Sequence, residues 1–188
     1  SPDHQLVHVG LQGLDVPKDE LPDSNLVFLL DVSGSMKPAN KLPMLKSCFK
    51  MMVDYLTEND TISIVVYASG TRMVLPPTTG DQKAVIMEAL DHLQAGGSTN
   101  GAAGLELAYR MARQNFRPNG VNRVILATDG DFNVGLASID ELIDLVQRQR
   151  HGGIALTTLG FGGGNYNDHL MEQLADEGNG HYAYIDRL

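Results

Sequence analysis

The sequence predicts an α/β fold: a Rossmann-like, doubly wound, mostly parallel sheet with helices on both faces and one short antiparallel edge strand. Three observations lead to this prediction. Five apolar runs have the length and composition of β-strands, and the first of them is uninterrupted, as is typical of a strand buried on both faces. Segments with helical periodicity separate these runs, and such alternation is typical of a parallel sheet covered on both sides. A sixth, shorter run directly follows a Ser-Gly turn, which favours an antiparallel pairing with the run before it.

The strands are expected where the apolar runs lie, namely at residues 26–31, 61–67, 121–128, 154–160 and 181–185. The antiparallel edge strand is expected at residues 72–75, after Ser69 and Gly70. Between the strands, apolar residues recur every three or four positions along one helical face. These stripes are Leu42, Leu45, Phe49, Met52, Val53 and Leu56; Ile86, Leu90 and Leu93; Leu105, Ala108, Tyr109 and Ala112; Ile139, Leu142, Ile143 and Val146; and Leu170 with Leu174.

Capping residues indicate where three of these helices begin or end. Asp81 is the expected N-cap of the second helix. Ser138 and Glu141 have the spacing of a capping box at the start of the fourth helix. The short fifth helix should end near Gly178, because glycine commonly terminates helices.

The chain is expected to contain an N-terminal extension and one domain. Residues 1–24 form the extension, an edge strand at 4–11 followed by a proline-containing loop, and residues 25–188 form the domain. The chain has no initiator Met and stops abruptly, so we expect a domain cut from a longer protein. No apolar run approaches the length of a membrane span, so this domain is not expected to insert directly into a membrane.

The composition argues against nucleic acid as a partner. The chain carries 14 basic and 23 acidic side chains, a net charge of −9, which repels phosphate backbones.

Cys48 is the only cysteine and lies on a predicted helix among apolar residues, so it is expected to be a core residue. The segment 160–165 is rich in glycine but lacks the spacing of a dinucleotide-binding loop and does not follow the first strand.

Oxygen-bearing side chains follow the first predicted strand directly. Asp31, Ser33 and Ser35 alternate with Val32 and Gly34, immediately after the apolar run 26–30. Ligands of open α/β sheets bind at the carboxyl ends of the strands. Hard divalent cations such as Mg²⁺ prefer oxygen ligands, so this segment is predicted to form half of a metal site.

Two further loops can supply the other half. Thr99 lies in a glycine-rich loop between the second and third helices, and Asp129 follows the third long strand. If that strand neighbours the first, Asp31 and Asp129 approach each other and repel unless one is protonated or a cation lies between them. Each residue alone also has an ordinary structural interpretation: the serines and Thr99 as helix caps, and Asp129 with Gly130 as a turn.

The pattern Asp31-x-Ser33-x-Ser35, then Thr99, then Asp129 resembles the metal-ion-dependent adhesion site of the von Willebrand factor type A domain. The resemblance runs from about residue 25 to 185. The sequences around Asp31 and Asp129 are similar to those of bacterial YfbK-like members of the family. It implies that these five residues bind one divalent cation directly or through water, with Mg²⁺ expected and Mn²⁺ or Ca²⁺ as alternatives. One coordination position would accept a carboxylate from a protein partner. A second ion is not expected, because Met36-Lys37-Pro38 replaces the additional acidic residues of integrin-type domains.

The resemblance therefore implies a non-catalytic, metal-dependent protein-interaction module, used in adhesion or scaffolding, whose parent protein is exported or associated with the bacterial envelope. The residues that flank the predicted ligands are candidates for partner contacts. They are Met36, Lys37, Asn100, Asp131, Phe132 and Asn133. A regulatory subunit of a chelatase-like ATPase complex is an alternative. A serine hydrolase, with Ser33 or Ser35 as nucleophile and His181 as base, is disfavoured because no Gly-x-Ser-x-Gly turn is present.

Overall fold

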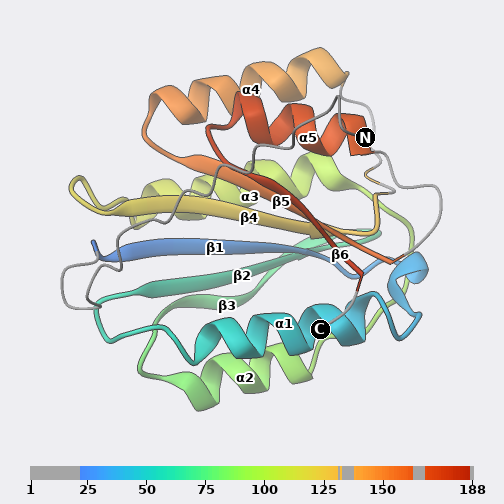
Figure 1. Cartoon of the computed structure of the whole chain (residues 1–188), viewed down its shortest axis with the longest axis horizontal. Coiled ribbons are helices and arrows are strands. Elements are labelled where there is room, and N and C mark those ends of the chain that lie inside the picture. Colours follow the sequence, from blue (N-terminus) through green and yellow to red (C-terminus); the bar gives the residue numbers. More distant parts are fainter. Residues whose placement is uncertain (1–21, 131, 133–137, 163–167, 187–188) are drawn as a thin grey trace, which may run out of the picture.

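The computed structural model describes residues 22–130, 132, 138–162 and 168–186. A six-stranded sheet forms the middle layer, and helices cover both of its faces (Figure 1). The strands are β1 (Ser24–Asp31), β2 (Thr61–Tyr67), β3 (Thr71–Thr79), β4 (Val121–Thr128), β5 (Ala155–Phe161) and β6 (Tyr182–Ile185). The helices are α1 (Leu42–Val53), α2 (Lys83–Asp91), α3 (Gly101–Gln114), α4 (Ile139–His151) and α5 (Asp168–Glu177), with a 3₁₀ turn at Gly34–Met36.

The order of the strands is β3-β2-β1-β4-β5-β6, and all neighbouring pairs are parallel except β2 and β3. The fold class predicted from the sequence is confirmed. The strand β1 is central and pairs with β2 and β4, so that Asp31 lies beside Tyr67 and Leu30 lies beside Ala127. The chain order reverses between β1 and β4, and ligands bind doubly wound sheets at such a reversal.

The core consists of two apolar layers, one on each face of the sheet. Helices α3, α4 and α5 cover one face, and α1 and α2 cover the other (Figure 1). Alternate residues of β1 serve both layers: Val27 and Leu29 pack with α3, whereas Phe28 and Leu30 pack with α1. The rings of Phe28 and Phe49 meet edge to face with centroids 4.4 Å apart. This two-sided burial explains why β1 is apolar without interruption.

The structure corrects two details of the predicted elements. The edge strand β3 has nine residues, longer than the expected 72–75, and includes Pro76 and Pro77. Proline is tolerated there because β3 is an edge strand with a register shift opposite Ile62 and Ile64. The N-cap of α2 is Gln82, one residue after the expected Asp81, and its side chain makes no capping hydrogen bond. The predicted capping box at the start of α4 is confirmed.

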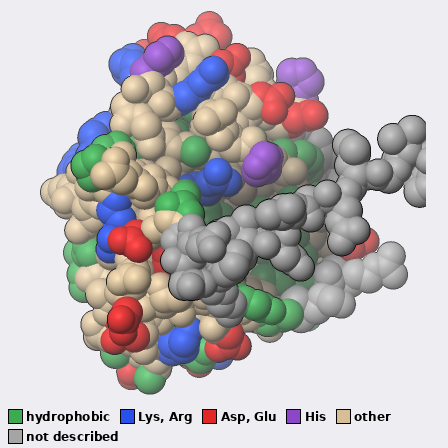
Figure 2. Space-filling view, turned by 60° about the vertical axis from the view of Figure 1, so that its left-hand side comes forward, with side chains coloured by type: hydrophobic (Ala, Val, Ile, Leu, Met, Phe, Trp, Pro, Cys, Tyr) green, Lys and Arg blue, Asp and Glu red, His purple; other side chains and the backbone are tan. Residues whose placement is uncertain are grey.

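Most of the extension predicted for residues 1–24 lies outside the described residues, although Ser24 is the first residue of β1. Within the described ranges, every helix is too short or too polar to cross a bilayer. On the face seen in Figure 2, acidic and basic side chains are interspersed and do not form a continuous basic stripe.

Candidate metal centre

Three loops meet at the carboxyl ends of β1 and β4. Main-chain hydrogen bonds join the loop after β1 to the loop before α3: the Gly34 amide donates to Gly97 O at 3.0 Å, and the Gly96 amide donates to Val32 O at 2.8 Å. These bonds fix the glycine-rich segment that carries Thr99 against the segment that carries Ser33 and Ser35. The structure therefore brings together the loops on which the sequence placed the five candidate ligands.

Asp31 is buried, and its carboxylate accepts three hydrogen bonds. The Ser33 amide donates to Oδ1 at 2.8 Å, and the hydroxyls of Thr128 and Tyr67 donate to Oδ2 at 3.0 and 3.3 Å. Burial raises the pKa of Asp31, and the charge of Asp129 raises it further, against the lowering effect of these donors. Burial together with the charge of Asp31 raises the pKa of Tyr67 well above its ordinary value, so the Tyr67 hydroxyl stays protonated. Asp31 is thus a costly buried charge whose two oxygens have fixed directions.

The serine hydroxyls face each other across the 3₁₀ turn. Ser33 Oγ and Ser35 Oγ are 2.9 Å apart, with Ser33 buried and Ser35 half-buried. Ser33 occupies the N-cap position of the turn, but its side chain makes no capping hydrogen bond. Thr99 is half-buried and precedes the N-cap of α3, which is Asn100. The interpretation of Ser33 and Thr99 as simple helix caps is therefore not supported.

Asp129 lies at the end of β4, and only 3% of its side chain is exposed. Lys41, the N-cap residue of α1, donates to Asp129 Oδ2 at 2.7 Å, and 19% of its own side chain is exposed. The methylene stem of Lys41 passes close to Gly162, where a Cβ atom would lie 2.6 Å from Lys41 Cε. Lys41 was not among the predicted site residues, because no local pattern in the sequence connects a lysine before α1 with the end of β4.

Thr128 is a second residue that the sequence analysis missed. Its hydroxyl donates to Asp31 and accepts a hydrogen bond from the Gly130 amide at 3.2 Å. It thereby couples the orientation of the Asp31 carboxylate to the turn that carries Asp129. Thr128 could have been suspected because it directly precedes Asp129. However, the sequence of a strand end does not show which side chain points toward the neighbouring strand.

The donor set of these loops suits a hard divalent cation. Two carboxylates and three hydroxyls offer oxygen ligands, the preference of Mg²⁺. In the described part of the chain, no group of three His, Cys, Asp or Glu side chains converges into a metal site. A cation at this place would therefore depend on the hydroxyl oxygens of Ser33, Ser35 and Thr99 in addition to the carboxylates.

The candidate partner contacts differ in their exposure. Lys37 and Asn100 are exposed. Met36 is buried in the apolar layer beneath α1, and Phe132 is 5% exposed. The Phe132 ring packs edge to face on Tyr67 with centroids 5.8 Å apart, so Met36 and Phe132 stabilise the loops and offer little surface to a partner. Asp131 and Asn133 lie outside the described residues.

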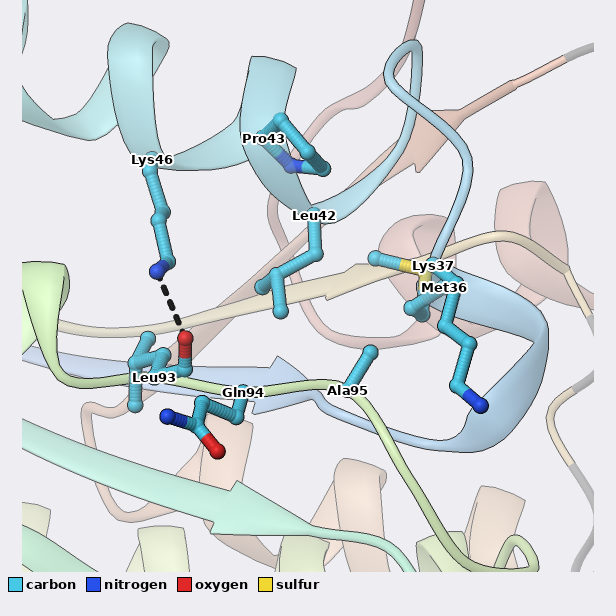
Figure 3. Close-up of a pocket in the computed structure, with 8 residues that line it drawn as sticks. All are labelled: Met36, Lys37, Leu42, Pro43, Lys46, Leu93, Gln94 and Ala95. Carbon is cyan, nitrogen blue, oxygen red and sulfur yellow. Dashed lines mark hydrogen bonds between the residues drawn. The ribbon is translucent and has the colours of Figure 1, made fainter.

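A pocket of about 290 Å³ opens beside the 3₁₀ turn (Figure 3). Its lining is mainly apolar, and the Lys46 side chain, whose ammonium donates to Leu93 O, flanks it. The lining residues are Met36, Lys37, Leu42, Pro43, Lys46, Leu93, Gln94 and Ala95. Because Met36 directly follows Ser35, the pocket lies next to the candidate metal ligands.

The geometry does not favour the hydrolase alternative. His181 lies at the start of β6, whereas Ser33 follows the end of β1. Two other strands, β4 and β5, separate β1 from β6, so the two strands are roughly 14 Å apart across the sheet. That separation is too large for His181 to act as the base for either serine.

Comparisons with known proteins agree with the fold. A family profile described as the von Willebrand factor type A domain matches residues 25–187. The uncharacterized protein YfbK of Escherichia coli is 49% identical over 183 residues, which is 97% of this chain and 32% of that protein. The human inter-alpha-trypsin inhibitor heavy chain H3 is 29% identical over 178 residues, 90% of this chain and 19% of that protein. The chain thus spans a third or less of the length of these two relatives.

Solved structures share the fold. A von Willebrand factor type A protein from Catenulispora acidiphila has a TM-score of 0.74 and 24% identity, covering 88% of this chain and 39% of the other. Proximal thread matrix protein 1 from the mussel byssus, in a structure with a zinc-occupied MIDAS motif, has a TM-score of 0.69 and 22% identity. It covers 87% of this chain and 42% of the other.

Proposed function

The chain belongs to the von Willebrand factor type A family, and we propose that it is a non-catalytic module that binds another protein through a divalent cation. In this proposal Asp31, Ser33, Ser35, Thr99 and Asp129 hold the ion, directly or through water. When bound, the ion supplies an electrophilic centre with a position for an oxygen ligand from outside the chain.

The observation that carries the proposal is the pair of serine hydroxyls 2.9 Å apart, beside the buried Asp31 carboxylate. Neutral hydroxyl oxygens complete the coordination shell of a hard cation without adding negative charge. The zinc-occupied site reported for the mussel protein supports a divalent ion in the family. Mg²⁺ is the proposed ion here, because the donor set consists of oxygens.

We propose that a partner delivers a carboxylate to the open position of the ion. The exposed Lys37 and Asn100 stand next to the ligands and would contact the partner there. The neighbouring pocket would receive an apolar side chain that flanks the partner's acidic residue, since its lining is mainly apolar and includes two lysines.

Calorimetric titration of chelator-stripped protein with Mg²⁺ and Mn²⁺ tests the site. We expect binding by the parent protein and loss of measurable binding in Ser33→Ala and Asp129→Ala. Ser47→Ala is the matched control, because Ser47 is an exposed serine of α1 whose hydroxyl bonds only within its own helix. Equal metal binding by all four proteins would refute the assignment.

A second measurement tests the open position. Bound Mn²⁺ that retains an exchangeable water enhances the relaxation of bulk water protons, and a competing carboxylate removes that enhancement. We expect acetate to reduce the enhancement in a saturable way in the Mn²⁺-loaded parent. An ion whose relaxation effect is insensitive to acetate would contradict the proposed mode of partner binding.

A further inference from the structure

Lys41 brings a positive charge into the candidate metal centre from an element that supplies none of the proposed ligands. We propose that Lys41 is a built-in counter-ion of Asp129 that limits the affinity of the centre for its divalent cation. This inference rests on the proposed function, because it concerns the ion at that same site.

Two contacts hold the Lys41 ammonium in place. Its Nζ atom donates to Asp129 Oδ2 at 2.7 Å, and its stem lies against Gly162 at the end of β5. Gly162 has φ of +89°, so a larger residue would be strained there and would also collide with the Lys41 stem. The contacts of Lys41 therefore connect α1, β4 and β5. The ion pair is shielded from solvent, because only 3% of the Asp129 side chain is exposed.

The charge of Lys41 opposes the charge of a bound cation. A divalent ion at Asp129 meets an ammonium group on the same carboxylate, and the repulsion between these like charges lowers the net gain of metal binding. Without the ion, the Lys41 ammonium compensates the negative charge of the largely buried Asp129 carboxylate. The same lysine thus stabilises the metal-free domain and weakens the metal complex.

Calorimetry on Lys41→Met measures the effect. Methionine retains much of the stem and removes the charge. We expect roughly tenfold or greater tightening of Mn²⁺ binding. The matched control is Lys50→Met, which removes the same charge from an ion pair of α1 that involves none of the proposed ligands, since the Lys50 ammonium donates to Asp91 Oδ1 at 2.6 Å. Its affinity should stay within about twofold of the parent.

Thermal unfolding in chelator gives an independent readout. Lys41→Met should lower the melting temperature of the parent, and should change it much less in an Asp129→Asn background, where the carboxylate charge is already absent. A Lys41→Met variant that binds Mn²⁺ as the parent does, or more weakly, overturns this inference alone. A parent that binds neither ion overturns the proposed function, and this inference with it.

Discussion

Replacing Asp31 by Asn should stabilise the domain without metal and destabilise it with metal. Burial raises the pKa of Asp31, so ionising this carboxyl group costs more free energy in the folded domain than in the unfolded chain. The direction of this pKa shift shows that the desolvation of the charge outweighs the three hydrogen bonds that the carboxylate accepts. Asn has no charge to bury, so Asp31→Asn should raise the free energy of unfolding in chelator by on the order of 1 kcal/mol.

The pH dependence of stability determines the sign of the effect expected for Asp31→Asn. Below the ordinary carboxyl pKa of 3.8, Asp31 is protonated in both states and costs nothing. As the pH rises through the raised pKa of the folded state, the unfolded chain releases its proton first, and stability is lost. The advantage of Asp31→Asn should therefore grow from acid to neutral pH. Metal affinity changes in the opposite direction, since the ion requires ionised Asp31 and acid weakens its binding.

Urea unfolding between pH 4 and 8, in chelator and in Mg²⁺, measures both effects. At a Mg²⁺ concentration of 100 Kd the parent gains about 2.7 kcal/mol, enough to reverse the order of the two proteins. Asp60→Asn is the control, because Asp60 also accepts several hydrogen bonds but lies outside the candidate centre, before β2. An Asp31→Asn variant that is less stable than the parent in chelator at pH 7 would refute the reasoning.

Four further substitutions separate the site from the scaffold. Thr128→Val should cost about 1–2 kcal/mol and weaken Mg²⁺ binding, whereas Thr158→Val, which removes another buried hydroxyl that bonds to the main chain, should lower urea stability alone. Gly101→Ala would place a Cβ 2.4 Å from the Phe132 ring, so we expect a loss of about 1–3 kcal/mol in urea unfolding together with weaker metal binding in calorimetry. Ser138→Ala removes a capping box and should cost about 1 kcal/mol by the same unfolding measurement, with metal affinity unchanged.

Local periodicity was sufficient to predict the sheet and most of its helices. The runs at β2 and β4 coincide with the strands, because both are buried on two faces and bounded by turn residues. The edge strand β3 was predicted too short, since its prolines lower the apparent strand propensity although an edge position tolerates them. The loops that carry the five candidate ligands could be found in the sequence because oxygen-bearing side chains follow two apolar strands and precede one helix.

Contacts between distant segments were not predictable in this way. Lys41 reaches Asp129 across 88 positions, and Thr128 reaches Asp31 across 97. Neither pairing leaves a local signature, because each depends on which strands become neighbours and how the loops turn. The same reason explains why Met36 and Phe132 were assigned to the partner surface: a sequence does not show on which side of a loop an apolar side chain lies, and both are buried.

In the proposed function, the charges at this centre would link the metal to the partner. Asp31 and Asp129 bring two negative charges and Lys41 one positive charge, so the protein groups alone are net negative and attract a cation. A divalent ion bound as proposed would reverse that sign and leave one net positive charge in a largely buried place. Water cannot neutralise this charge, but a carboxylate from a partner can, in a domain whose overall charge of −9 otherwise repels acidic partners. On the inference drawn above, Lys41 would therefore make metal binding weaker while making the bound ion a stronger acceptor for an acidic ligand.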